Sequence, residues 1–445
     1  MCCMHYMHLP VTLHACADKP IDGLISPRAS PPPPPKCVFV RHYLLCCRLL
    51  FPPGSMTSPA GALRLAFHGC GLIAEHHLHA MVRASAACGI SATVAAFVDI
   101  DPSRATRLAE MAGVRGVRGD DHPGRVTGCK GGRDCFATLD EALDARAVDA
   151  VLVMLPHHLH EEAAVTTMRR DKHLLLEKPM GCTLGQCVRI LEEAESAAER
   201  TDGRHVFSVA ENSSFWPEVV AASALLEAGA IGEVVTARAH YYEAMSNRIM
   251  DKDEAGGSAP KTATDWVDWR SSLARAGGGV CIDGGLHWLR PLREWLGEVE
   301  EVVAVAARPH QGLQGESLCH ALLRFRSNVS ASYQCTVLDH HATLGTREPF
   351  FRIIGRRGEI TIDGEFSGGG MLFNAEHPRG QSIVGADNRG FIASYAPQMV
   401  DYLRAVAAGN PKALHRPPIH AYYDLLAIHA MYRSLETGRW ERVLP

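Results

Sequence analysis

From residue 63 onward the chain alternates between short hydrophobic runs and longer segments of mixed hydrophobic and polar residues. Uninterrupted apolar runs are typical of strands buried on both faces, and the segments between them are typical of amphipathic helices. This alternation predicts a parallel sheet covered by helices on both sides. The predicted strands span 65–67, 93–99, 150–155, 173–176 and 205–210, and the predicted helices span 72–87, 102–112, 139–145, 159–170 and 183–199.

After about residue 212 the pattern changes to strands joined by loops, with few helices between them. This predicts a mainly antiparallel sheet in a second, α+β domain. We therefore expect an α/β protein with one domain over 63–211, a second over 212–445, and a binding site between them. The second domain has predicted strands at 233–242, 299–306, 321–325, 330–338, 351–354 and 359–362, and predicted helices at 221–227, 395–408 and 422–435.

Residues 1–62 lack this pattern and contain a proline run at 31–35, which predicts a disordered N-terminal extension. The apolar stretch at 37–51 is interrupted by charged residues and is shorter than the roughly 20 residues of a membrane span. No basic cluster precedes the weak apolar run at 9–17, so we do not predict a secretory signal. We expect a cytoplasmic protein, and organellar import through the extension stays open. A glycine-rich insertion is predicted at 113–134.

Composition narrows the class of protein. A chain of 445 residues with 47% hydrophobic residues can bury a large core, and its net charge of −4 gives no reason to expect a nucleic-acid partner. Six of the 15 cysteines lie in the first 50 residues, and the others are scattered without Cys-x-x-Cys spacing. This usage predicts reduced thiols in an intracellular protein.

A glycine-rich turn joins the first predicted strand to the first predicted helix, where residues 69–74 are Gly-Cys-Gly-Leu-Ile-Ala. In such a turn Gly69 allows the tight bend, Gly71 lets the backbone approach a pyrophosphate, and Ala74 allows close helix–strand packing. The N-terminus of the helix stabilises phosphate charge. The position between strand and helix favours dinucleotide binding, and the alternative is a glycine-rich turn of another α/β protein.

Asp99 ends the second predicted strand, where a carboxylate would accept hydrogen bonds from both ribose hydroxyls and repel a 2′-phosphate. This position favours NAD over NADP, whereas the nearby Arg104 favours a phosphate. The alternative is that Asp99 caps the following helix.

The strand at 173–176 leads into Glu177-Lys178-Pro179. Proline disfavours the α conformation of the preceding residue, so Lys178 should be extended at the carboxyl end of a strand, where open α/β sheets bind ligands. A lysine there can stabilise charge that develops on a substrate oxygen. The alternative is a solvated surface lysine.

A third candidate lies at 277–288, where three glycines precede Asp283 and His287. If the segment from residue 281 is helical, these two side chains lie four residues apart on one face. A neutral histidine suits the removal of a hydroxyl proton near pH 7. The alternative is a His–Asp pair that braces a helix.

Histidine clusters at 76–79, 157–160 and 340–341 lack zinc-finger or metalloprotease spacing, so we predict no metal site. Cys129 and Cys135 in the insertion are interpreted as plain thiols.

From about residue 63 to the C-terminus, an ordered set of motifs resembles the Gfo/Idh/MocA family of nicotinamide-dependent oxidoreductases. The glycine turn with His77, the Glu-Lys-Pro tripeptide and the glycine-rich segment before His287 carry most of the likeness. The other matching segments are 99–105, Pro156 with His160, 231–233 and 354–360. His157 stands where asparagine is usual in the family.

The resemblance implies a Rossmann domain followed by a domain whose open sheet often mediates dimerisation. It implies NAD or NADP as cofactor, a small-molecule substrate and a homo-oligomer. The N-terminal extension, the insertion at 113–134 and the segment at 251–264 depart from the family, so the substrate stays open. The catalytic residues implied are Lys178, Asp283 and His287, and the cofactor-binding residues are Gly69, Cys70, Gly71, Leu72, Ile73, Ala74, Asp99, Arg104, Pro156, His160, Glu177 and Lys178.

We therefore expect an NAD(P)-dependent dehydrogenase that transfers a hydride between nicotinamide and a sugar, cyclic polyol or related hydroxy compound. His287 would accept the proton, Lys178 would polarise the substrate oxygen, and Asp283 would orient the site. One alternative is an NAD-dependent glycoside hydrolase that oxidises and then re-reduces its sugar. Another is a non-catalytic, cofactor-binding regulator on the same fold.

Overall fold

The computed structural model describes residues 61–117, 134–244, 269–310, 312–338, 350–363, 369–384 and 390–444. All of them belong to one unit, Pro52–Pro445. The predicted extension up to residue 60, most of the predicted insertion and the segment at 251–264 lie outside the described residues, as do Cys129 and the pair at 340–341.

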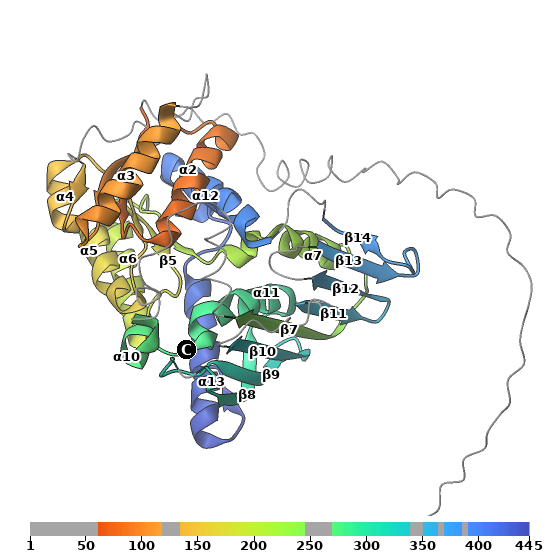
Figure 1. Cartoon of the computed structure of the whole chain (residues 1–445). Helices are drawn as coiled ribbons and strands as arrows, with labels where there is room; N and C mark the ends of the chain where they lie inside the picture. Colours follow the sequence, from red (N-terminus) through yellow and green to blue (C-terminus); the bar gives the residue numbers. More distant parts are fainter. Residues whose placement is uncertain are drawn as a thin grey trace, which may run out of the picture. The chain divides into compact units, whose positions relative to one another are not determined.

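The first domain is built on a six-stranded parallel sheet, which we call sheet A, in the order β3-β2-β1-β4-β5-β6 (Figure 1). This order is that of the doubly wound dinucleotide-binding fold, and the predicted parallel sheet is confirmed. The strands are β1 (Leu63–His68), β2 (Ala92–Val98), β3 (Cys135–Phe136), β4 (Ala150–Val153), β5 (His173–Glu177) and β6 (Phe207–Ala210). The helices are α2 (Leu72–Cys88), α3 (Pro102–Val117), α4 (Leu139–Ala145), α5 (His160–Arg169) and α6 (Leu184–Arg200).

Local sequence explains where two of these helices begin. The side chains of Thr138 and Thr183 each accept a hydrogen bond from the backbone N–H three residues later. In return, the side-chain oxygens of Glu141 and Gln186 each accept one from the threonine backbone N–H. Each pair forms a capping box, which satisfies donors that the first helical turn leaves without partners.

The second domain is built on a nine-stranded mixed sheet, sheet B, in the order β14-β13-β12-β11-β7-β10-β9-β8-β15. All neighbouring strands are antiparallel except β7 and β10, so the predicted mainly antiparallel sheet is confirmed. The strands are β7 (Val234–Ala244), β8 (Val299–Ala307), β9 (Leu318–Phe325), β10 (Ser330–Leu338), β11 (Phe351–Gly355), β12 (Gly358–Asp363), β13 (Gly369–Asn374), β14 (Gln381–Ser382) and β15 (Glu441–Arg442).

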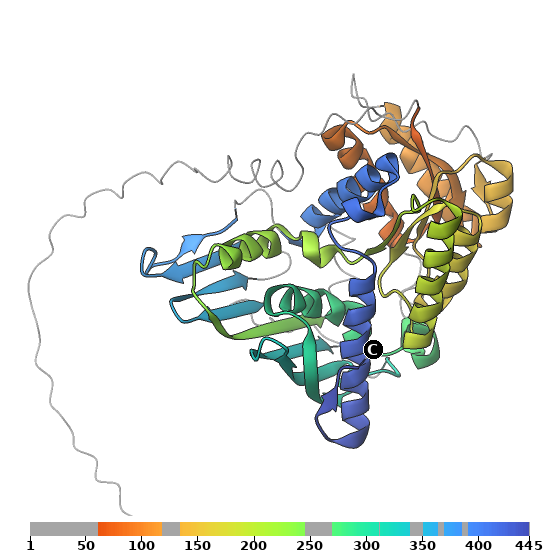
Figure 2. The same ribbon diagram turned by 180° about the vertical axis from the view of Figure 1, so that it is seen from behind.

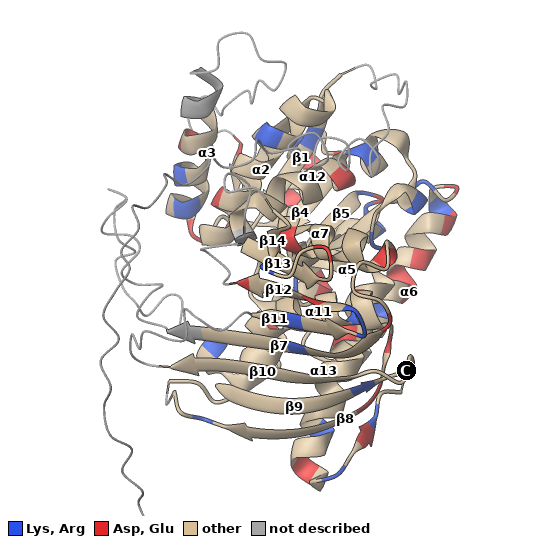
Figure 3. Cartoon of the chain, turned by 90° about the vertical axis from the view of Figure 1, so that its right-hand side faces the viewer, with Lys and Arg blue, Asp and Glu red and all other residues tan. Residues whose placement is uncertain are grey.

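Helices cover one face of sheet B. Helix α11 packs on β7 and β10, and α13 packs on β8 and also contacts α6 of the first domain. Residues on the other face alternate with the buried ones, as in β9, where every second residue is exposed. Figure 3 shows sheet B face-on, with its strands in front of the helices. The helices here are α7 (Pro217–Glu227), α10 (Leu273–Ala276), α11 (Leu286–Leu296), α12 (Gly390–Ala408) and α13 (Ile419–Thr437).

Helix α12 returns to the first domain, where it lies along α2 (Figures 1 and 2). Met399, Tyr402 and Leu403 of α12 share a buried cluster with Leu78 and Met81 of α2. One face of the nucleotide-binding domain is therefore completed by residues from near the end of the chain.

The segment from residue 281 is helical, but its first turn is not an α-helix. Residues Cys281–Gly285 form a π-helical turn, and the α-helix starts only at Leu286. Short π-helical turns are rare and are frequent at functional sites. None of the described helices has both the length and the apolar composition that a membrane span requires.

Candidate functional site

The predicted site residues gather at the carboxyl edge of sheet A. Gly69 follows β1, Asp99 follows β2 and Pro156 lies shortly after β4. Lys178 follows β5, and Glu211 follows β6. Open parallel sheets bind ligands outside this edge, at the point where the strand order reverses, here between β1 and β4.

The two glycines of the turn are needed for different reasons. Gly69 has φ of +95°, and a Cβ there would lie 2.3 Å from the carbonyl oxygen of Met154, so the chain itself requires glycine. At Gly71 the backbone is extended, with φ of −76°, and a Cβ would meet no atom within 4 Å. Because the fold does not require glycine at 71, a ligand that approaches this backbone would explain it. The space lies at the N-terminus of α2, which suits a pyrophosphate.

The other side chains of the turn differ in burial. Ala74 is fully buried against the sheet, whereas Leu72 is 48% exposed. The Cys70 thiol is buried, 3.6 Å from the carbonyl oxygen of Val98, and Ile73 is partly buried. Leu72 is thus the one side chain of the three at 70, 72 and 73 that is largely exposed.

Asp99 ties the turn to the second strand. Its Oδ2 accepts a hydrogen bond from the Cys70 backbone N–H at 2.8 Å, and its Oδ1 accepts one from Asp101 N–H at 2.9 Å. Each carboxylate oxygen has a second lone pair, so these bonds leave acceptors for ribose hydroxyls. Arg104 lies beside Asp101, with Nε 3.4 Å from its Oδ2.

Glu177 and His160 are placed behind this edge. Glu177 is buried and bonds to His77 of α2, with 2.7 Å between Oε1 and Nε2. Burial acts to raise the pKa of Glu177, but the hydrogen bond and charge of His77 outweigh it and lower the pKa. The buried His160 has one ring nitrogen 2.7 Å from the Pro179 carbonyl oxygen and the other 2.8 Å from that of Leu155. Glu177 thus links the end of β5 to α2, and His160 links the segments that follow β4 and β5.

Lys178 meets Asp283, as the sequence predicts for residues of one site. The Lys178 ammonium donates to Asp283 Oδ1 at 3.1 Å and to the Asp283 carbonyl oxygen at 2.7 Å. Arg270 donates from Nε to Asp283 Oδ2 at 2.7 Å. One carboxylate is thus shared by two cations, and all three side chains are partly exposed.

His157 borders this cluster. Its Nε2 lies 3.7 Å from Asp283 Oδ1, and its Nδ1 lies 2.9 Å from the Ala276 carbonyl oxygen. Trp269 packs against the ring at a centroid distance of 4.4 Å. Burial lowers the pKa of His157 well below its usual value, although Asp283 acts in the opposite direction.

His287 has a different carboxylate partner from the one its spacing suggests. Its Nδ1 lies 2.6 Å from Glu211 Oε1, and both side chains are buried. Burial acts to raise the pKa of Glu211, but the charge of His287 and its hydrogen bond outweigh burial and lower that pKa to about 2. The carboxylate therefore stays ionised and fixes the orientation of the ring.

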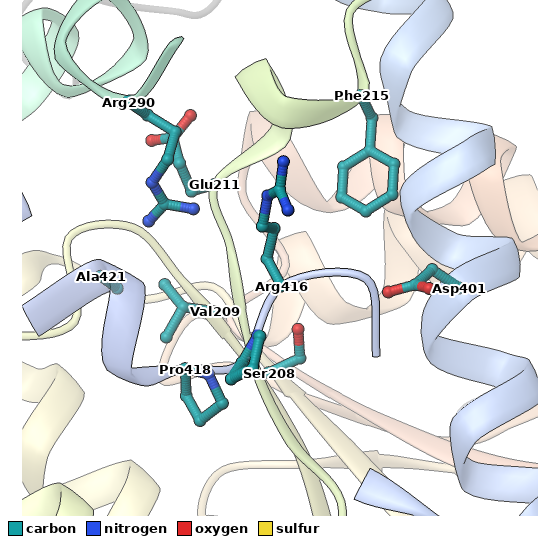
Figure 4. A pocket seen from close by; sticks show the side chains of 10 residues that line it. Ser208, Val209, Glu211, Phe215, Arg290, Asp401, Arg416, Pro418 and Ala421 are labelled. Atoms are coloured by element: carbon teal, nitrogen blue, oxygen red, sulfur yellow. The ribbon is translucent and has the colours of Figure 1, made fainter. Parts of the chain in front are cut away.

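Glu211 also lines a pocket with Arg290, Asp401 and Arg416 (Figure 4). The charge of Arg290 adds to the forces that keep Glu211 ionised. Arg290 is itself buried and bonded to Asp424, as is Arg293. Sequence reasoning missed Glu211, although it follows β6 directly, just as Lys178 follows β5.

The described residues contain no group of three or more histidine, cysteine, aspartate or glutamate side chains placed to hold a metal ion. The cysteines among them are free thiols, most of them buried.

The sheet order, the glycine-rich turn and the acidic end of β2 define a two-domain dinucleotide-binding protein. Comparison with known families agrees. Residues 63–202 match the oxidoreductase family model with an NAD-binding Rossmann fold, and residues 219–361 match the GFO/IDH/MocA C-terminal domain. The chain belongs to the GFO/IDH/MocA oxidoreductase family.

Several characterised proteins are similar over part of the chain. Inositol 2-dehydrogenase 2 of Saccharopolyspora erythraea is 31% identical over 38% of this chain and 41% of its own length. Levoglucosan dehydrogenase of Pseudarthrobacter phenanthrenivorans is 26% identical over 57% of this chain and 63% of its own. The 2,7-anhydro-N-acetylneuraminate hydratase of Escherichia coli is 23% identical over 54% of this chain and 58% of its own. The chain thus spans about half the length of these relatives.

Two solved structures share the fold over nearly their whole length. Levoglucosan dehydrogenase in complex with NADH and levoglucosan has a TM-score of 0.66 and 19% identity, over 86% of this chain and 100% of that one. The WlbA dehydrogenase of Bordetella pertussis, in complex with NADH and UDP-GlcNAcA, has a TM-score of 0.65 and 18% identity, over 87% and 99%.

Proposed function

We propose that the protein is an NAD(P)-dependent dehydrogenase of a sugar, cyclic polyol or related hydroxy compound. Two contacts support this proposal: Lys178 with Asp283, and His287 with Glu211. Lys178 and Glu211 follow adjacent strands, β5 and β6, at the ligand-binding edge of a dinucleotide-binding sheet. The names of the inositol and levoglucosan dehydrogenases support the substrate class.

The cofactor would be held by the backbone of the glycine-rich turn and by Asp99. Gly71 leaves room for the pyrophosphate at the N-terminus of α2. Asp99 keeps acceptors for the ribose hydroxyls, and its negative charge disfavours a 2′-phosphate, so we propose NAD as the preferred form. Arg104, beside Asp101 at the surface, is the residue that would favour NADP instead.

A nicotinamide cofactor held by the glycine-rich turn and Asp99 would supply a hydride acceptor for the carbinol carbon, or a hydride donor in the reverse direction. The chain's residues manage the proton and the charge on oxygen. The Lys178 ammonium would donate a hydrogen bond to the substrate oxygen and stabilise its negative charge. His287 would take the hydroxyl proton as the carbonyl forms, and Glu211 would stabilise the resulting imidazolium.

Asp283 has a separate role in this scheme. It holds the ammonium of Lys178 and the guanidinium of Arg270 at fixed positions. Two cations around one carboxylate leave a net positive charge, which suits an oxygen that becomes negative in the transition state.

A net redox-neutral reaction is the second candidate, because one relative is named as a hydratase. A tightly held NAD would then supply the oxidation of the sugar and its later re-reduction during bond cleavage or water addition, and the same residues would move the proton and stabilise the charge on oxygen. The two functions differ in whether reduced cofactor accumulates.

A panel of myo-inositol, levoglucosan, aldoses and dihydrodiols, each with NAD and NADP, tests the proposal. Growth of absorbance from reduced nicotinamide supports a dehydrogenase and gives the cofactor preference. Product release without such growth supports the redox-neutral reaction. The absence of both, in a sample that binds neither nucleotide, contradicts the proposal.

We also propose that the protein forms a homo-oligomer through the open face of sheet B. Val305 and Leu322 on this face are 66% and 53% exposed, which is unusual for large apolar side chains on adjacent strands. Sedimentation equilibrium of the wild type and of Leu322→Arg tests this: the wild type should sediment as a dimer or larger, and the variant should dissociate.

A further inference from the structure

His157 is a buried imidazole whose orientation is fixed on two sides. Its Nδ1 lies 2.9 Å from the carbonyl oxygen of Ala276, and the Trp269 ring packs edge-on against it at 4.4 Å. The side chain is only 3% exposed. The ring therefore cannot turn without losing both contacts.

These contacts also determine which nitrogen carries the hydrogen. A carbonyl oxygen can only accept, so Nδ1 must be the donor to Ala276. Burial lowers the pKa of His157 well below its usual value, with Asp283 acting in the opposite direction, so the ring is neutral near pH 7. In a neutral imidazole with its hydrogen on Nδ1, Nε2 bears a lone pair and can only accept.

The lone pair of Nε2 faces another acceptor. Asp283 Oδ1 lies 3.7 Å away, beyond hydrogen-bond length, and it already accepts from the Lys178 ammonium at 3.1 Å. Among the described residues no group donates a hydrogen bond to Nε2. An acceptor in such a position is satisfied when a ligand brings the missing donor.

We propose that His157 Nε2 accepts a hydrogen bond from a hydroxyl group of the bound ligand and so helps to select a polyhydroxylated substrate. This inference rests on the proposed function. The hydroxyl belongs either to the carbon next to the reacting centre of the substrate or to the ribose of the cofactor. His157 stands beside Lys178 and Asp283, the groups proposed to handle the substrate oxygen, which favours the substrate as the source.

The substitution His157→Asn tests the two ring nitrogens separately. The asparagine amide nitrogen occupies roughly the place of Nδ1 and can still donate to Ala276, whereas nothing replaces the acceptor at Nε2. His157→Gln does the converse, because its longer side chain places an amide oxygen near the Nε2 position. His377→Asn, in the turn between β13 and β14, is the matched control.

Two measurements are made on each full-length variant. The first is NADH affinity, from the change in nicotinamide fluorescence. The second is KM and kcat for myo-inositol or levoglucosan, whichever the wild type oxidises. We expect His157→Asn to raise KM about tenfold with little change in NADH affinity, since one hydrogen bond to a ligand is lost. His157→Gln should recover part of that loss, and His377→Asn should match the wild type.

The two measurements show whether the hydroxyl group belongs to the substrate or to the cofactor ribose. A raised KM with unchanged NADH affinity assigns the hydroxyl to the substrate, and weakened NADH binding assigns it to the ribose. Unchanged KM and NADH affinity in a His157→Asn variant that melts with the wild type overturns the inference. A wild type that neither binds NADH nor oxidises any compound of the panel overturns the proposed function instead.

Discussion

The candidate site contains two carboxylates that are used in opposite ways. Asp283 is 20% exposed and is shared by Lys178 and Arg270, which are 16% and 20% exposed. Glu211 is 2% exposed and holds one imidazole, that of His287. The Asp283 cluster can exchange partners when a ligand arrives, because solvent reaches its charges. The Glu211 pair is already arranged before any ligand binds.

The difference follows from the helix that carries both Asp283 and His287. Asp283 lies in the π-helical turn, which projects toward β5, whereas His287 lies in the first turn of α11 and meets the residue after β6. A change of helix type within five residues thus accompanies different partners for two positions that lie four residues apart. We therefore expect substitutions around Asp283 and around Glu211 to change catalysis in different ways.

The largest effect on turnover is expected in the cluster of Lys178, Asp283 and Arg270. Lys178→Ala should lower kcat at least about a hundredfold, because it removes the cation proposed to stabilise the substrate oxygen. NADH affinity should change little. Lys172→Ala, just before the other end of the same strand, is the control and should keep wild-type turnover. Unchanged turnover in Lys178→Ala would refute the proposed role.

The buried pair should be tested with Glu211→Gln. The amide still bonds to the ring but no longer stabilises an imidazolium, so kcat should fall roughly tenfold to a hundredfold. The acidic limb of the pH profile of kcat/KM should move to lower pH, because protonation of the base becomes less favourable. The pKa of Glu211, about 2, keeps its own titration outside the assay range.

The matched control for Glu211→Gln is Glu294→Gln, which also neutralises a buried carboxylate. It should lower the melting temperature without moving the pH profile. A profile that shifts equally in both variants would show that the loss of any buried charge, and not the contact with His287, is responsible.

Asp99→Asn tests the cofactor end of the site. The amide oxygen can still accept from a backbone N–H, but the charge that disfavours a 2′-phosphate is gone. We expect the ratio of kcat/KM for NAD to that for NADP to fall about tenfold. Asp140→Asn, on the first turn of α4, should leave the ratio unchanged. An unaltered ratio in Asp99→Asn would exclude Asp99 as the discriminating residue.

The smallest effect concerns stability rather than catalysis. Burial lowers the pKa of His173 to about 4, and its Nδ1 accepts a hydrogen bond from Val206 N–H at 3.0 Å. Since the unfolded chain takes up this proton near pH 6.5 and the folded chain only near pH 4, stability is present above pH 6.5 and falls across that window. His173→Asn keeps an acceptor for Val206 and removes the titration. Its melting temperature should fall less than that of the wild type between pH 6.5 and 4, by about 3 to 6 °C. Parallel curves would contradict the assignment.

The sequence was most informative where the contacts are local. The turn at 69–74, the end of β2 and the strand before Lys178 follow from patterns within a few residues, and their elements are confirmed. The meeting of Lys178 with Asp283 required the additional inference that both belong to one site. Glu211, Arg270 and the orientation of His157 could not be predicted, since each depends on a contact between segments distant in the chain. The π-helical turn has no signal in hydrophobic periodicity.

The packing of α12 on α2 has a consequence for how the protein is made. A ribosome completes β1, α2 and β2 long before it reaches residue 390, so the apolar side of α2 leaves the exit tunnel without the helix that will cover it. Nascent chains usually fold domain by domain from the N-terminus. Here the first domain lacks part of its cover until residues 390–408 have been made, and during that interval the apolar side of α2 is open to contact with other chains.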